Sequence, residues 1–124
     1  MAWENDYYMR LNHETIKTIL SLLGENGDHP TTDMVGDPNG RKDAIRILKE
    51  ATEGQVCEAE NHLYDLIENQ DPKALKIGLL LYDYLNEQTE EFLEEHDFSH
   101  DEVKDGIKNL ASRYGFGALT ETMQ

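Results

Sequence analysis

The side chains best placed to do chemistry are Glu58, His62 and Asp65, which stand at positions i, i+4 and i+7. In a helix this spacing puts all three on one side. Imidazole and carboxylate groups are common ligands of divalent transition metals, so the triplet predicts a metal site if another element adds a further carboxylate. The alternative interpretation is an exposed polar face opposite an apolar stripe.

Other catalytic chemistries find less support. His13 and Glu14 begin like the helix of a zinc protease, but Lys17 stands where the second histidine is required. Cys57 is the single cysteine, and the adjacent Glu58 opposes formation of a thiolate. We therefore predict no catalytic residue and no cofactor, and we lean away from an enzyme without excluding one.

Four aromatic residues of the predicted helices could serve either the core or a binding groove. They are Tyr64, Tyr82, Tyr84 and Phe92. If packed helices leave a groove, aromatic side chains of this kind are typical of its lining, and a partner helix or extended peptide could bind there.

Composition excludes several classes of partner. The 124 residues include 26 Asp and Glu against 11 Lys and Arg, for a formal net charge of −15. This excess argues against nucleic-acid binding, which depends on basic side chains, and against docking on anionic lipid. With one cysteine and no long apolar run, we expect a cytoplasmic protein that does not span a membrane.

Apolar residues recur at helical spacing and predict an all-α fold in a single domain, residues 1–124. Five main helices are expected at about 6–23, 41–53, 55–69, 72–87 and 100–114, with a short helical turn near 90–95. Their predicted start signals are Asn5, Asp71 before Pro72, Thr89, and Ser99 with Glu102.

The segments between the helices differ in character. Residues 25–40 are rich in turn-forming residues and are expected to form a flexible loop, and residues 116–124 a C-terminal tail. The helix that follows Pro72 is apolar nearly all round, which is typical of a central, buried helix. The short turn at Gly54 predicts that the helices beside it form an antiparallel hairpin.

One stretch resembles half of a tetratricopeptide repeat (TPR). Gly54, Ala59, Leu63 and Leu66 fit the second helix of such a repeat, although Pro72 is one position late and the first half does not match. The resemblance implies antiparallel, TPR-like helical hairpins rather than a true repeat protein.

Four segments carry a second resemblance: residues 6–10, 58–63, 74–86 and 98–115. On these segments the whole chain resembles an uncharacterised family, a domain of unknown function, of small acidic all-helical proteins from Gram-positive bacteria. The family implies a TPR-like helical arrangement and no assigned activity.

Three functions follow as hypotheses. The first is a non-enzymatic helical module that binds a protein partner or a second copy of itself as a homodimer. The alternative is a metal-binding protein or small metal-dependent enzyme that uses carboxylates and His62. The third is an acidic inhibitor that mimics nucleic acid, which requires one continuous acidic face.

Overall fold

The computed structural model describes residues 2–28 and 30–121, and within these ranges the chain is all-helical, without a strand. The elements are α1 (Ala2–Leu22), η1 (Thr32–Val35), α2 (Pro38–Thr52), α3 (Val56–Glu68), α4 (Ala74–Asn86), α5 (Glu90–Glu95), α6 (His100–Arg113) and η2 (Gly117–Thr120), where η denotes a 3-10 helix. The predicted fold class, the five main helices and the short helix near residue 90 are confirmed.

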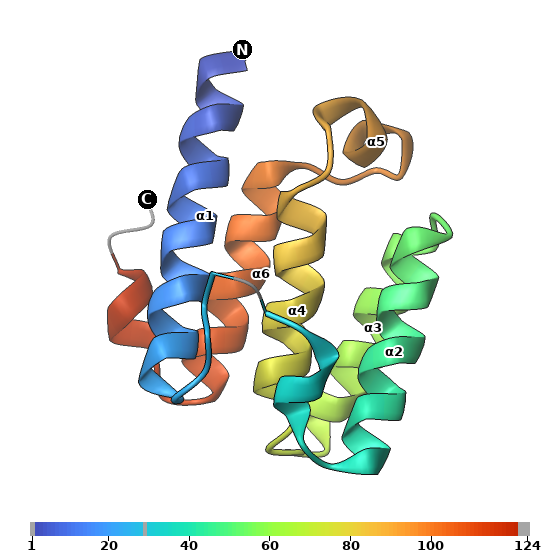
Figure 1. The fold of residues 1–124 in the computed structure, drawn as a ribbon. Helices are drawn as coiled ribbons and strands as arrows, with labels where there is room; N and C mark the ends of the chain where they lie inside the picture. Colours follow the sequence, from blue (N-terminus) through green and yellow to red (C-terminus); the bar gives the residue numbers. More distant parts are fainter. Residues whose placement is uncertain (1, 29, 122–124) are drawn as a thin grey trace.

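Helix α4 is the centre of the fold, as its apolar sequence predicts. It packs against α1 and α6 on one side and against α2 and α3 on the other (Figure 1). Leu79, Leu81 and Leu85 are completely buried on it, as is Tyr82. Burying one such side chain stabilises the folded state by about 1.5–3 kcal/mol, so this helix supplies much of the core.

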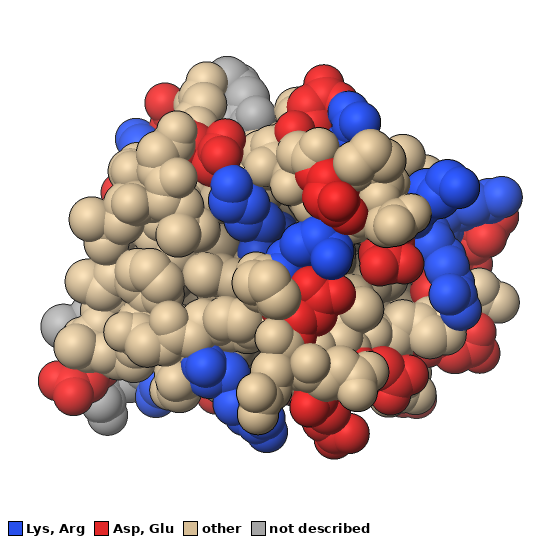
Figure 2. All heavy atoms as spheres, turned by 90° about the horizontal axis from the view of Figure 1, so that it is seen from below, with Lys and Arg blue, Asp and Glu red and all other residues tan. Residues whose placement is uncertain are grey.

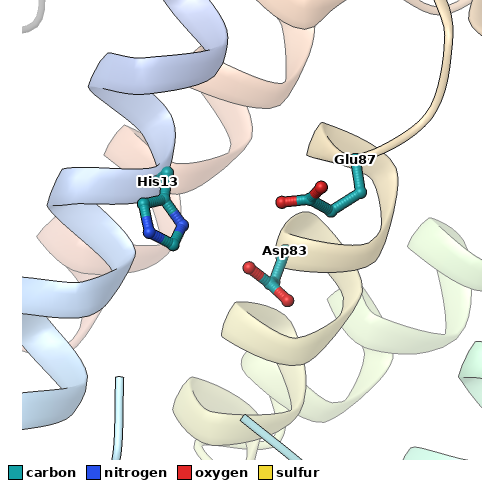
Figure 3. A group of neighbouring side chains, drawn as sticks. All are labelled: His13, Asp83 and Glu87. Atoms are coloured by element: carbon teal, nitrogen blue, oxygen red, sulfur yellow. The ribbon is translucent and has the colours of Figure 1, made fainter. Parts of the chain in front are cut away.

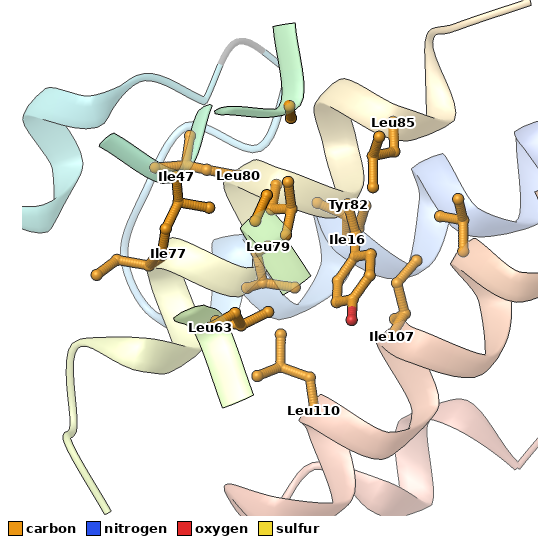
Figure 4. Packing of buried hydrophobic residues seen from close by; sticks show 14 of the residues in the cluster. Ile16, Ile47, Leu63, Ile77, Leu79, Leu80, Tyr82, Leu85, Ile107 and Leu110 are labelled. Carbon is orange, nitrogen blue, oxygen red and sulfur yellow. The ribbon is translucent and has the colours of Figure 1, made fainter. Parts of the chain in front are cut away.

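The core draws on every helix that surrounds α4. Figure 4 shows Leu79 and Tyr82 of α4 among Leu63 of α3 and Ile107 and Leu110 of α6. Because these residues come from opposite sides of α4, one continuous core joins both halves of the molecule.

Helices α2 and α3 form the predicted hairpin. Gly54 lies between them with φ of +86°, a left-handed conformation that glycine adopts without steric cost. Helix α3 runs back along α2 from this turn (Figure 1).

Two of the predicted start signals act as expected. The Thr89 hydroxyl accepts a hydrogen bond from the backbone N–H of Phe92 at 3.1 Å and starts α5. The Ser99 hydroxyl accepts one from Glu102 N–H at 3.1 Å and starts α6.

Three helix starts differ from the approximate predicted positions by two to four residues. Helix α1 begins at Ala2 rather than after Asn5, since no proline or glycine precedes Asn5 to stop the helix. Helix α2 begins at Pro38 rather than Arg41, because the Asp37 carboxylate accepts from Gly40 N–H at 2.9 Å and proline suits the first helical position.

Helix α4 starts late for a similar local reason. The Asp71 carboxylate accepts a hydrogen bond from Lys73 N–H at 3.0 Å, and Ala74 N–H donates to the Asp71 carbonyl at 3.0 Å. These bonds close a turn over Pro72, so the helix begins at Ala74 rather than Pro72.

The segment predicted as a flexible loop contains η1 and is tied to the helices by lysines. Lys17 of α1 pairs with Asp28 at 3.1 Å. Lys76 of α4 pairs with Glu25 at 2.7 Å and also donates to the Met34 carbonyl at 3.2 Å. These contacts carry the segment from α1 to α2 across the face of α4 (Figure 1).

A buried group of polar side chains fixes α1 against α4 and α6. The Asn12 amide donates to the Asn86 side-chain oxygen and to the His100 carbonyl, both at 3.1 Å. The Asn86 amide donates to the Met9 carbonyl at 2.9 Å. Because a buried amide without a partner costs about 1–3 kcal/mol, these bonds select one register of the three helices.

The contact between α4 and α6 generates a prediction at Gly106. A Cβ atom at this position would overlap the Tyr82 ring. We expect Gly106→Ala to lower the free energy of unfolding by about 1–3 kcal/mol through overpacking, although alanine favours an isolated helix. Urea denaturation measures the change, with Asn109→Ala on the exposed side of α6 as the matched control. A stabilising Gly106→Ala would contradict the packing described.

Candidate functional site: a groove over the central helix

One strip of α4 is less covered by the surrounding helices than the rest of the helix, and we call it the uncovered strip. Leu80, Asp83, Tyr84 and Glu87 follow the i, i+3 and i+4 spacing that places them on one face. Leu80 is buried, Asp83 and Tyr84 are half-buried, and Glu87 is exposed. The strip thus changes from apolar to acidic toward the end of the helix.

This strip forms the floor of a groove, which we call the α4 groove. Its volume is about 420 Å³, and its lining residues are Pro30, Thr31, Thr32, Leu48, Thr52, Leu80, Asp83, Tyr84 and Glu87. Helix α2 supplies one wall through Leu48 and Thr52, and residues 30–32 also line the groove. Apolar side chains dominate the floor, with two carboxylates at its edge.

The edge of the α4 groove also holds a cluster of ionisable groups that joins two helices. His13 projects from α1 toward Asp83 of α4 and toward Glu87, the residue that follows this helix (Figure 3). One ligand atom from each of the three side chains lies within 4.8 Å of the other two. Within the described residues, none of the three side chains takes part in a hydrogen bond or ion pair.

The electrostatics of this cluster are unfavourable for its carboxylates. Burial raises the pKa of Asp83, the nearby charge of Glu87 raises it further, and His13 opposes the shift. Both carboxylates lie at the C-terminal end of α4, where the helix dipole is negative and the last turn contains no basic residue. A cation at this position would relieve both effects.

The predicted metal triplet is arranged differently. The Nδ1 atom of His62 lies 2.6 Å from the Glu50 carboxylate, and its Nε2 atom lies 3.0 Å from the Arg46 guanidinium. Arginine only donates hydrogen bonds, so Nε2 accepts and Nδ1–H donates to Glu50. Both ring nitrogens therefore join α3 to α2, and the guanidinium adds a positive charge beside them.

The two carboxylates of that triplet lie outside this contact. Glu58 is exposed on α3. Asp65 is also exposed and shares a cavity of about 130 Å³ with His62 and Arg46. The structure thus pairs His62 with Glu50, which the spacing within one helix could not indicate.

The four aromatic candidates occupy different environments. Tyr82 is fully buried, and its hydroxyl donates to the Glu60 carboxylate at 2.8 Å. Tyr64 donates to the same carboxylate at 3.3 Å, and the Phe92 ring contacts the His96 ring with centroids 4.5 Å apart. Of the four, Tyr84 lines the α4 groove.

Sequence reasoning missed the cluster of His13, Asp83 and Glu87. It tested His13 against a zinc-protease motif and treated α4 as apolar all round. The available signal was the pair of carboxylates at i and i+4 at the end of a largely apolar helix. Their partner on α1, His13, lies 70 positions before Asp83 and 74 before Glu87, so only the packing brings it near them.

Comparison with known proteins identifies the family of this chain. The model of the DUF6483 family, described as a family of unknown function, matches residues 2–115. The chain therefore belongs to this family. Comparisons with curated proteins and with solved structures give no match. Within the described residues, no helix has both the length and the apolar character needed to cross a membrane.

The raised pKa of Asp83 generates a prediction about stability. A carboxyl group whose pKa is higher in the folded than in the unfolded state binds its proton more tightly when folded. The folded state therefore loses stability as the pH rises from the unfolded-state pKa of Asp83 through its higher folded-state pKa. At neutral pH the ionised carboxylate destabilises the fold. We expect Asp83→Asn to raise the free energy of unfolding at pH 7, by less than about 1 kcal/mol because solvent screens the half-buried group.

The gain should shrink as the pH falls toward 3.8, the ordinary pKa of the group. Urea denaturation of chelator-treated protein at several pH values measures the trend. Glu94→Gln on exposed α5 removes the same charge elsewhere and corrects for the general acidity of the chain. Greater destabilisation by Asp83→Asn than by this control at pH 7 would show that the carboxylate stabilises the fold.

Proposed function

We propose that this member of a family of unknown function is a non-enzymatic protein-interaction module with a TPR-like helical arrangement. Its α4 groove binds a segment of a partner protein that carries an apolar side chain next to lysine or arginine. The observation that carries the proposal is the α4 groove itself, in which an apolar floor adjoins two carboxylates without a hydrogen-bond or ion-pair partner among the described residues.

The apolar part of the groove suits a side chain of a partner. Leu48 and Leu80 contribute aliphatic surface from two helices, and Tyr84 adds an aromatic ring. A volume of about 420 Å³ falls within the range of about 300–1,000 Å³ that is typical of binding pockets. Stacked helical hairpins commonly present concave surfaces that bind peptides, which supports the same role here.

The acidic part of the groove favours a basic segment over a second copy of this chain. A neighbouring cavity of about 280 Å³ shares Glu87 with the α4 groove and adds Asp6 and Glu90. Carboxylates thus continue along the path of an elongated ligand. Complementary charge steers association, whereas two copies of this acidic surface repel each other.

On one face of the molecule, basic side chains lie among the acidic ones. The face seen from below carries Lys and Arg interspersed with Asp and Glu (Figure 2). Lys73, for example, pairs with Asp71 at 3.3 Å. The carboxylates of Asp83 and Glu87 have no such ion pair among the described residues, which favours binding of a basic segment at the groove edge.

Labelled short peptides test the proposal in a fluorescence anisotropy assay. One set combines Lys with Leu, a second combines Glu with Leu, and a third combines Lys with Ser. We expect the Lys/Leu set to bind best, because it alone matches both parts of the groove. Glu87→Lys should weaken its binding by about tenfold or more, which corresponds to about 1.4 kcal/mol.

Two controls separate the groove from general electrostatics. Glu68→Lys makes the same charge change on the exposed side of α3 and should leave the affinity within about twofold, since distant surface charges are screened. Leu48→Asn alters the apolar wall and should reduce binding while circular dichroism shows an intact helical fold.

Equal binding of the Lys/Ser set, or equal effects of Glu87→Lys and Glu68→Lys, would overturn the proposal. Concentration-dependent dimers that block peptide binding would instead identify a second copy as the occupant.

A further inference from the structure

We propose that His13, Asp83 and Glu87 form a binding site for a divalent transition-metal ion, and that Zn²⁺ is the ion favoured by their chemistry. The site goes beyond the proposed function, because it requires no partner protein. It combines ligands from α1 and α4 at the edge of the α4 groove (Figure 3).

The geometry is close to that of a coordinated ion. The candidate ligand atoms lie within 4.8 Å of one another. Two ligands at about 2.0–2.1 Å from a tetrahedral zinc ion lie about 3.3 Å apart, so small side-chain rotations bring the three groups into contact with one ion. Asp83 and Glu87 are one helical turn apart on the same face, which lets both carboxylates approach it.

The two helices are held in register beside the cluster. Asn12 precedes His13, Asn86 precedes Glu87, and the two asparagine side chains are joined by a buried hydrogen bond of 3.1 Å. This bond fixes the relative position of the backbone that carries two of the three ligands. The framework of the site is thus organised before any ion binds, which reduces the cost of binding.

The donor set selects a class of ion. One imidazole nitrogen and two carboxylate oxygens suit Zn²⁺, Mn²⁺ or Fe²⁺, whereas Ca²⁺ and Mg²⁺ prefer oxygen ligands throughout. Among the three transition-metal ions, Zn²⁺ binds most tightly to a given set of such ligands. With three protein ligands, a fourth position stays open toward the groove for water or another ligand.

The surroundings leave the ligands free to bind. None of the three side chains has a hydrogen-bond or ion-pair partner among the described residues, and Glu87 is exposed, so an ion can enter from solvent. His62, by contrast, contacts both Glu50 and the Arg46 guanidinium. A cation would meet competing positive charge there, and at His13 it would meet two carboxylates.

Binding of an ion has a consequence for the α4 groove that rests on the proposed function. A metal ion and a basic side chain would neutralise the same carboxylates of Asp83 and Glu87. Each should therefore lower the affinity for the other, since coupling between two ligands is reciprocal.

Calorimetric titration of the chelator-treated, dialysed protein with zinc chloride tests the site without any peptide. We expect one zinc ion per chain and a rise in the melting temperature when zinc is added, because an ion that binds the folded state stabilises it. His13→Gln, Asp83→Asn and Glu87→Gln should each lower the zinc affinity by at least about tenfold. Cobalt(II) bound to the same site should show the visible absorption bands that are typical of a cobalt ion with few ligands. His13→Gln should abolish these bands.

Matched variants and ions decide the result. His62→Gln removes the histidine that lies beside the Glu50 carboxylate, and it should leave zinc binding unchanged. Loss of zinc binding in His62→Gln with retention in His13→Gln would overturn the proposal. A protein that binds no zinc would also overturn the proposed site. Equal affinities for Zn²⁺, Mg²⁺ and Ca²⁺ would overturn it as well, because they would show unspecific attraction of cations to an acidic surface. Zinc binding with no peptide binding would refute the proposed function alone.

Discussion

The burial of α4 is the constraint on which the other features of the structure depend. A helix enclosed by four others has no solvent to satisfy its polar side chains, so each must find a partner or lie on the uncovered strip. Tyr82 meets the first condition through Glu60, and Asn86 through Asn12 and the Met9 carbonyl. Asp83 and Glu87 have no such partner among the described residues and lie on the uncovered strip instead. The acidic edge of the α4 groove is therefore where the remaining charge of the central helix must lie.

The same constraint explains why α1 lies as it does. An apolar face alone allows a helix to slide or turn with little loss of buried area, because hydrophobic contact is not directional. Asn12 removes this freedom, since displacement of α1 would leave buried amide groups without partners. One pair of asparagines thus orients α1 and sets His13 opposite the uncovered strip. The arrangement of the core and that of the candidate site have the same cause.

Local signals predicted the fold well, because helices are largely determined by residues near in sequence. Apolar spacing located all five main helices, and the hydroxyl caps at Thr89 and Ser99 marked two starts. The start of α2 was missed because Asp37 and Pro38 lie in a turn-rich stretch that hides a strong cap.

The candidate site could not be predicted in the same way. His62 was placed on the correct helix, but its contacts with Glu50 and Arg46 depend on how α2 packs against α3. The cluster around His13 depends on the register of α1 against α4, and no sequence period relates these helices.

The distribution of charge in this molecule is more informative than its net charge. A formal net charge of −15 is compatible with solubility alone and does not distinguish one partner from another. The structure shows that Lys17 and Lys76 are held in ion pairs that fasten the segment between α1 and α2. Asp83 and Glu87 gain no such partner, although Lys76 belongs to the same helix. The carboxylates at the groove edge are therefore a local excess of negative charge that His13 offsets without an ion pair among the described residues. A cation or a basic segment would neutralise it more fully.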